Sequence, residues 1–274
     1  MSKSYVLSVG IDKYQSIAIP NLSWAANDAR VFYDELTQGR ASTSVESLLL
    51  IDDQATTSTI RDAMGDWLKT ANEEDNIVAF FAGHGARELP VGADIRNGTE
   101  AYLLPSDADM DHLYATSISL SNELPIILKR ISAGNVTFIF DCCLAGSSRT
   151  FDSKFRSRGM DGPNFTKIQA ISDVWLNAAV TADNGSLHDV GEGVSVLMAC
   201  GPNQVALEDS ALKHGVFTYH LLEVLAEYRK SGSISVSLGN VYAEVVKLVL
   251  DHTQATQVPV LEGRLADQQL YVGR

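Results

Sequence analysis

The sequence has few cysteines and no long hydrophobic run. Only three of its 274 residues are cysteine, and two of these are adjacent. Neighbouring cysteines rarely reach disulfide geometry, and the third would be left alone, so a regular disulfide framework is excluded. No stretch reaches the ~18 apolar residues of a membrane span, and the apolar residues before Asp12 are too few for a signal-peptide core. We therefore expect a protein of the reducing cytoplasm, with no membrane as partner.

Positive charge is also scarce. The chain has 21 lysines and arginines against 34 acidic residues, a formal net charge of −13. Neither nucleic acid nor an anionic membrane would be attracted to such a surface, whereas basic or unstructured polypeptides would be. The sequence also lacks a phosphate-binding loop, a pair of zinc ligands and a G-x-S-x-G elbow, so it requires no cofactor or metal.

Short apolar runs alternate with amphipathic stretches along the chain. Thr59–Asp62 fits a capping box, and apolar residues then follow with helical spacing. This alternation predicts one α/β domain over 1–274, with a mostly parallel sheet covered by helices on both faces. The predicted strands are 4–11, 45–51, 76–83, 135–140 and 194–200, and the predicted helices start near Ile60, Phe217 and Asn240.

Two stretches, 84–115 and about 144–190, interrupt this alternation. The second is longer than the ~12–15 residues usual for loops in compact domains, which indicates a functional or disordered segment. Its polar part, 147–164, reads as exposed and flexible. It holds a group of basic residues in an otherwise acidic protein: Arg149, Lys154, Arg156 and Arg158.

The adjacent cysteines close the apolar run "TFIFDCC", where a strand opens into small residues. Side chains alternate along a strand, so Cys142 shares a face with Phe138 and Phe140 and is expected to pack in the core. Cys143 continues the face of Asp141 at the end of the strand, where open α/β sheets place their ligand sites. Cys143 is therefore the candidate nucleophile.

A cysteine nucleophile needs a base, and His84 is the candidate. It directly follows a predicted buried strand and lies between Gly83 and Gly85, where a substrate backbone can come close. The other histidines are interpreted as structural or surface residues: His112, His188, His214, His220 and His252.

The motifs Gly83-His84-Gly85 and Asp141-Cys142-Cys143-Leu144-Ala145-Gly146 resemble those of caspase-fold cysteine peptidases (peptidase C14-like), and among these the metacaspase and orthocaspase-like branch. The stretches 6–15, 22–32, 102–108 and 199–225 are also similar to family segments. Leu144 and Ala145 differ from the usual His-Ser, and Ala82 stands where many relatives have Ser. The resemblance implies the caspase-like (caspase-hemoglobinase) fold and a Cys-His dyad, which together predict a thiol endopeptidase.

The resemblance further implies that Asp28 and Asp141 line the primary pocket and select arginine or lysine before the cleaved bond. Asp28 also lies on the apolar face of its predicted helix, where an unpaired carboxylate is costly. The alternative for Asp28 is an N-terminal helix residue favoured by the macrodipole. Backbone N–H groups near Gly85 and Cys143 are expected to hold the oxyanion during attack.

The resemblance divides the chain into a large-subunit-like part, about 1–146, a flexible linker, about 147–190, and a small-subunit-like part, about 191–274. The four basic residues of the linker are candidate sites of self-cleavage, although a plain solvated loop is an alternative. Calcium activation and an activating partner protein also follow from the resemblance. Asp107, Asp109 and Asp111 do not make an EF-hand, because His112 and Ile118 occupy the positions of its glycine and glutamate.

Two other functions compete with the peptidase. One is a caspase-fold protein that no longer cleaves and serves as a binding or regulatory module. The other is a Cys-His hydrolase of small esters, which would need an apolar pocket. The joint presence of His84, Cys143, Asp28 and Asp141 favours a peptidase with specificity for basic residues.

Overall fold

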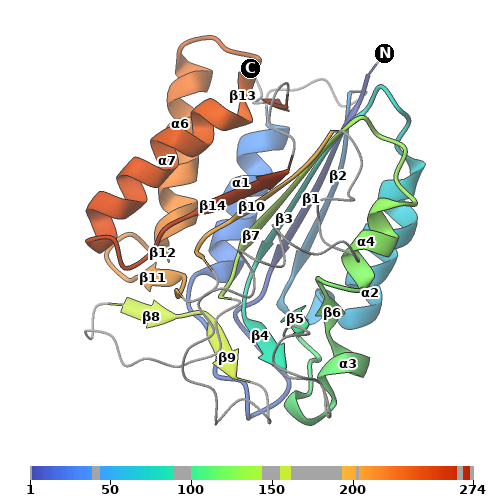
Figure 1. The fold of residues 1–274 in the computed structure, drawn as a ribbon, viewed down its shortest axis with the longest axis vertical. Coiled ribbons are helices and arrows are strands. Elements are labelled where there is room, and N and C mark those ends of the chain that lie inside the picture. The colour runs from blue at the N-terminus through green and yellow to red at the C-terminus, as the bar shows by residue number, and fades with distance from the viewer. Residues whose placement is uncertain are drawn as a thin grey trace.

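The computed structural model describes residues 2–38, 44–88, 100–143, 155–161, 193–201, 204–263 and 268–271. Figure 1 shows a twisted central sheet with helices on both sides. Its strand order is β14-β10-β7-β3-β1-β2, and all neighbours are parallel except β14 and β10. The strands are β1 (Ser4–Gly10), β2 (Val45–Ile51), β3 (Asn76–Ala82), β7 (Asn135–Asp141), β10 (Val194–Met198) and β14 (Val260–Gly263). The five predicted strands and the α/β class are confirmed.

Each face of the sheet packs against its own helices and forms its own hydrophobic core. The helices α1 (Ala25–Thr37), α6 (Val216–Lys230) and α7 (Leu238–Thr253) cover one face, and α2 (Thr57–Asp62) and α4 (Glu123–Leu128) cover the other (Figure 1). Strand alternation divides the side chains of β7 between these cores: Phe138 and Phe140 lie on the α2 side and Ile139 on the α1 side. This confirms the predicted layers.

The start of α2 differs from the expectation. Thr56 is the N-cap and Thr59 is its reciprocal partner, so the capping box predicted at Thr59–Asp62 is wrong by three residues. The Thr59 hydroxyl accepts from the Thr56 N–H and donates to the Gln54 carbonyl, which places it inside the first turn. The helix continues as a π-helical segment (Ala63–Trp67) and a 3-10 turn (Leu68–Thr70).

Small sheets gather at the end of the molecule where the central parallel strands end (Figure 1). One is β6-β5-β4-β9, formed by Ile118–Ser119, Glu100–Leu103, Gly85–Glu88 and Gly159–Asp161. The second is β12-β11-β8, formed by His214–Gly215, Leu207–Asp209 and Phe155–Ser157. The remaining elements are β13 (Ser235–Ser237), paired with β15 (Gln269–Tyr271), α3 (Leu113–Thr116) and the 3-10 turns Asp52–Gln54 and Met110–His112.

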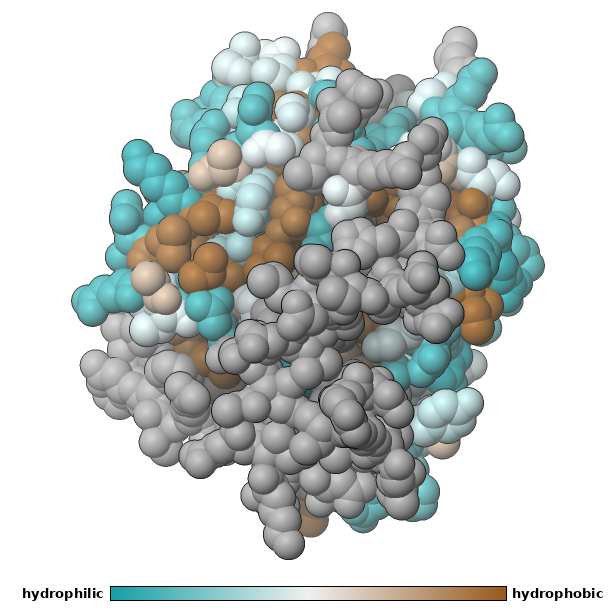
Figure 2. All heavy atoms as spheres, viewed as in Figure 1, coloured by the Kyte–Doolittle hydropathy of each residue, from teal (hydrophilic) through white to brown (hydrophobic). Residues whose placement is uncertain are grey.

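The molecular surface is mixed in polarity on the face drawn in Figure 2, with a band of hydrophobic residues over the region of α7 and β14. Strand β14 is an edge of the central sheet, and its Val260 and Leu261 are half-buried. Among the described residues, no helix is both long and apolar enough to cross a membrane.

Candidate active site

The predicted dyad residues lie at matching positions of two neighbouring strands. Strands β3 and β7 are parallel, with Ala82 opposite Asp141. His84 and Cys143 each follow two residues beyond this pair, and the Gly83 N–H still donates to the Asp141 carbonyl at 3.3 Å. The sheet therefore brings the histidine and the cysteine to one edge, at the carboxyl ends of its strands, where a ligand site is expected.

His84 is buried, and a contact at its Nε2 atom fixes the orientation of its ring. Its Nε2 lies 2.8 Å from the Pro20 carbonyl oxygen, and its backbone N–H donates to the Tyr14 hydroxyl at 2.7 Å. Because a carbonyl only accepts, Nε2 carries the proton in the neutral ring and Nδ1 keeps its lone pair. Burial lowers the pKa of His84 below 6.5, against the opposing effect of the Pro20 and Arg158 backbones. The neutral ring therefore prevails at neutral pH, as a general base requires.

The two adjacent cysteines lie in different cores. Cys142 packs in the core on the α2 side together with Phe138 and Phe140, as strand alternation predicts. Cys143 belongs to the core on the α1 side, and its Sγ lies 2.6 Å from the Ala206 N and 3.3 Å from the Ala206 O. Burial raises the pKa of the Cys142 thiol well above its usual range, so this thiol is a poor nucleophile.

An arginine from the predicted linker fills an acidic pocket at the same edge. Arg158 is 0% exposed. Its Nη2 lies 2.6 Å from Asp28 Oδ2 and 3.1 Å from Glu208 Oε1, and its Nη1 lies 3.0 Å from Asp141 Oδ2. Burial alone would lower the pKa of Arg158, but the three carboxylates outweigh burial and raise it. Asp28 and Asp141 thus converge on one guanidinium.

The carboxylates of this pocket are themselves tied to the surrounding chain. Asp28 lies in the first turn of α1 and accepts from the Gly215 N–H at 2.9 Å, so its helix position and its place in the pocket are compatible. Asp141 accepts from the Thr218 hydroxyl. Burial raises the pKa of Asp141 to about 6, although Arg158 opposes this shift.

Two residues of the pocket were not predicted from the sequence. Glu208, on β11, accepts from the Trp24 N–H at 2.9 Å and the Ser23 N–H at 3.1 Å, which ties the start of α1 to the pocket. His214 Nδ1 lies 2.6 Å from Asp28 Oδ1, so a histidine interpreted as structural or surface forms part of the pocket wall. The only sequence signal for Glu208 was an acidic residue directly after the apolar Val205–Leu207 run.

The backbone of Arg158 occupies the position where an oxyanion is expected. Its carbonyl oxygen accepts from the Gly85 N–H at 3.2 Å and from the Cys143 N–H at 3.4 Å. Its own N–H donates to the Ala206 carbonyl at 3.1 Å. The chain before Arg158 forms β8, antiparallel to β11, and the chain after it forms β9, parallel to β4. Arg158 therefore lies in the site as an extended segment held on both sides.

Comparisons with known proteins agree with the fold. The sequence matches the caspase domain family over residues 3–271. The chain belongs to the caspase domain family. Protein GSU0716 from Geobacter sulfurreducens, known from a crystal structure, shares this fold with a TM-score of 0.68 and 18% sequence identity, over 99% of this chain and 100% of that one. No curated protein matches the sequence.

The structure describes only some of the other candidate residues. Arg149, Lys154 and His188 lie outside the described residues, and only the backbone of Arg156 is described, in β8. Two of the three aspartates considered for calcium make contacts with neighbouring protein groups. Asp107 accepts from the Thr57 N–H and hydroxyl, and Asp109 pairs with His112. Within the described ranges, no group of three His, Cys, Asp or Glu side chains has the geometry of a metal site.

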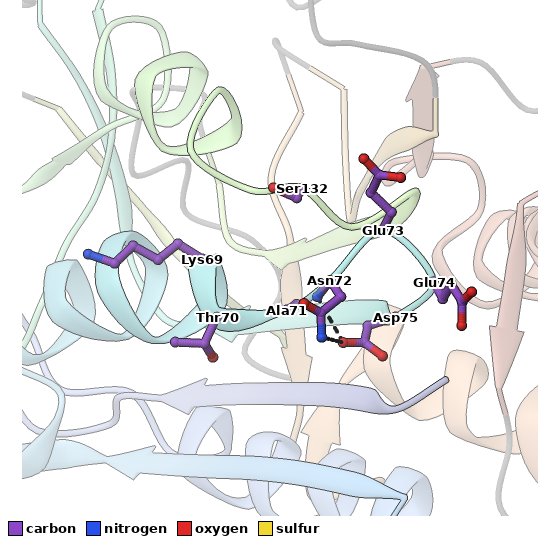
Figure 3. A pocket seen from close by; sticks show the side chains of 8 residues that line it. All are labelled: Lys69, Thr70, Ala71, Asn72, Glu73, Glu74, Asp75 and Ser132. Atoms are coloured by element: carbon purple, nitrogen blue, oxygen red, sulfur yellow. Dashed lines mark hydrogen bonds between the residues drawn. The ribbon is translucent and has the colours of Figure 1, made fainter. Parts of the chain in front are cut away.

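Figure 3 shows a surface pocket of about 640 Å³. It lies at the start of β3, whereas His84 follows the end of that strand. It is formed by Lys69–Asp75 and Ser132, just before β3 begins. Its Asp75 carboxylate already accepts from the backbone N–H groups of Lys3 and Asn72, at 2.7 and 2.8 Å. This pocket is therefore formed mainly by the turn before β3, and none of the candidate catalytic residues lines it.

Proposed function

We propose that the protein is a cysteine endopeptidase that cleaves after arginine or lysine, with His84 and Cys143 as its catalytic dyad. The position of Arg158 carries this proposal. Its guanidinium contacts three carboxylates while its carbonyl oxygen accepts from the N–H groups of Gly85 and Cys143. A residue that precedes a scissile bond needs both contacts at once.

The chemistry follows from the groups at the edge of the sheet. His84 Nδ1 takes the proton of the Cys143 thiol, and the thiolate attacks the carbonyl carbon of the bound residue. The N–H groups of Gly85 and Cys143 stabilise the negative charge that develops on the carbonyl oxygen. The imidazolium then gives its proton to the departing amine. Water hydrolyses the thioester, which releases the new carboxylate and the free enzyme.

The shape of the pocket favours arginine over lysine. The two terminal nitrogens of Arg158 reach different carboxylates, with Nη1 directed to Asp141 and Nη2 to Asp28 and Glu208. A lysine ammonium is a single point charge and cannot make both sets of contacts from one position. An aspartate side chain would meet three like charges. We therefore expect about tenfold preference for arginine over lysine, the value of one lost charged hydrogen bond, and no cleavage after aspartate.

The first substrate in this proposal is the chain itself, at the bond between Arg158 and Gly159. Of the four basic linker residues, we favour Arg158, because its guanidinium contacts Asp28 and its carbonyl oxygen accepts from the Gly85 and Cys143 N–H groups. The metacaspase-like branch, an activating partner protein and activation by calcium also belong to this proposal. Activation by calcium is suggested by the family resemblance alone, so the assay includes calcium as a variable.

The test is cleavage of fluorogenic peptides ending in Arg, Lys or Asp, with and without calcium, by wild type, Cys143→Ala and Cys142→Ala. We expect the Arg peptide to be cut best and Cys143→Ala to lose at least about 10³-fold of kcat/KM. Cys142→Ala is the matched control, because its thiol packs in the other core. Intact protein mass in the same samples should show residues 1–158 and 159–274 for wild type and Cys142→Ala, but not for Cys143→Ala.

Three results would contradict the proposal. Equal activity of Cys143→Ala and wild type would contradict the assignment of Cys143 as the nucleophile. Cleavage after Asp but not Arg would contradict the role of the acidic pocket, and an uncut chain in active enzyme would contradict self-cleavage. If no peptide and no chain is cut with or without calcium, the binding or regulatory module becomes the better reading.

A further inference from the structure

Two consecutive residues of β12 hold both oxygens of the Asp28 carboxylate. The Gly215 N–H donates to Asp28 Oδ2 at 2.9 Å, and His214 Nδ1 lies 2.6 Å from Asp28 Oδ1. Because a carboxylate only accepts, Nδ1 of His214 carries a proton, the reverse of the arrangement in His84. Arg158 Nη2 donates to Asp28 Oδ2 at 2.6 Å. Strand β12 therefore fixes the carboxylate so that Oδ2 faces the guanidinium.

The imidazole of His214 is itself held by groups from two helices. The Asn27 side chain, on α1, has its Nδ2 atom 3.4 Å from His214 Nδ1 and donates to the Lys213 carbonyl at 3.0 Å. The ring of Tyr219, on α6, has its centroid 5.9 Å from that of the imidazole. The His214 side chain is 16% exposed, whereas that of Asp28 is fully buried. The imidazole therefore lies between a buried charge and the surface.

The three carboxylates of the acidic pocket differ in what orients them. Glu208 accepts from two backbone N–H groups at the start of α1, and Asp141 accepts from the Thr218 hydroxyl. For Asp28, one of the two orienting groups is an imidazole side chain. Removal of that imidazole would take a hydrogen bond from a fully buried charge, which is costly. The carboxylate would then turn towards other donors or take up a proton, and either change weakens its contact with a guanidinium.

We propose that His214 positions Asp28 for the guanidinium of the residue before the cleaved bond. His214 is in this sense a positioning residue of the acidic pocket, because it acts on the substrate only through Asp28. This proposal rests on the proposed endopeptidase function and names a residue that sets the affinity of its primary pocket. Since His214 acts on binding, its loss should change KM for arginine peptides far more than kcat.

The test compares steady-state cleavage of a fluorogenic arginine peptide by wild type, His214→Asn and His214→Phe. Asparagine carries an amide N–H donor at the same number of bonds from the backbone as histidine Nδ1, whereas phenylalanine keeps a ring and has no donor. We expect His214→Phe to raise KM about tenfold, the value of one charged hydrogen bond, with kcat within about twofold of wild type. His214→Asn should keep KM within about threefold of wild type, because the donor to Asp28 is restored.

KM does not depend on the fraction of active enzyme, so partial folding of a variant does not affect this comparison. His112→Phe is the matched control, because His112 pairs with Asp109 on the surface and its loss should leave KM unchanged. A wild-type KM in His214→Phe would overturn the proposal, and so would a KM in His214→Asn as high as that in His214→Phe. Both results leave the endopeptidase function intact. Failure of wild type to cleave the arginine peptide would overturn that function and this proposal with it.

Discussion

At the scale of single residues, the charge of the acidic pocket depends on pH. Burial raises the pKa of Asp141 to about 6, with Asp28 and Glu208 adding repulsion and Arg158 opposing it. As pH falls through about 6, Asp141 takes up a proton and its attraction for a guanidinium is lost. We therefore expect KM for arginine peptides to rise between pH 7 and pH 5. Steady-state kinetics over this range would measure the change.

The same pH series separates the pocket from the dyad. Burial lowers the pKa of His84 below 6.5, so the ring stays neutral until the pH falls below that value. Alkylation of Cys143 by iodoacetamide, which carries no charge, reports the dyad without the pocket, so the pH profile of its rate follows His84 and can be compared with the profile of KM, which follows Asp141. A KM that stays constant down to pH 5 would contradict the assigned role of Asp141.

The pocket also shows which residues could be predicted from the sequence. Asp28 and Asp141 could be predicted because the family resemblance assigns both to the pocket, and Asp28 was also unusual as a carboxylate on the apolar face of its predicted helix. Glu208 and His214 lie on the short strands β11 and β12, and their contacts with α1 join residues more than 180 positions apart. Neither periodicity nor spacing contains that information, because it depends on how the two halves of the chain pack.

At the scale of elements, the junction of β12 and α6 forms the floor of the pocket. Gly215 is the N-cap of α6, and a Cβ there would lie 2.5 Å from Asp141 Oδ2 and 3.0 Å from Arg158 Nη1. Gly215→Ala should therefore narrow the pocket and lower kcat/KM for arginine peptides by about 10- to 100-fold, as overpacking does elsewhere. Gly239→Ala is the control, since its nearest contact would be 3.7 Å away. Equal kinetics of the two variants would show that the pocket does not close on the guanidinium at Gly215.

The elements differ in how far sequence patterns describe them. The central strands were predicted because continuous apolar runs are typical of parallel strands buried on both faces. The segment Phe155–Asp161 was predicted to be part of an exposed, flexible linker, yet it is extended and paired with β11 and β4. Its polar composition gave no strand signal, because its pairing comes from the edges of two existing sheets and from one buried arginine.

At the scale of the whole molecule, both halves of the chain contribute to one core. The core on the α1 side contains Val6, Phe32 and Phe80 from the first half and Leu197, Phe217 and Val245 from the second, all nearly or fully buried. Strand β10 pairs with β7, so the central sheet also crosses from one half to the other. A cut in the chain between Arg158 and Gly159 leaves all of these contacts in place.

We therefore expect the self-cleaved protein to stay in one piece under native conditions. Size-exclusion chromatography should give the same elution volume for the cut protein and for uncut Cys143→Ala, while a denaturing gel resolves fragments 1–158 and 159–274. Hydrophobic burial across the two halves makes the fragments depend on each other, because each alone would expose one side of the core. Separate elution of the fragments in buffer would show that the chain connection, and not the shared core, holds the halves together.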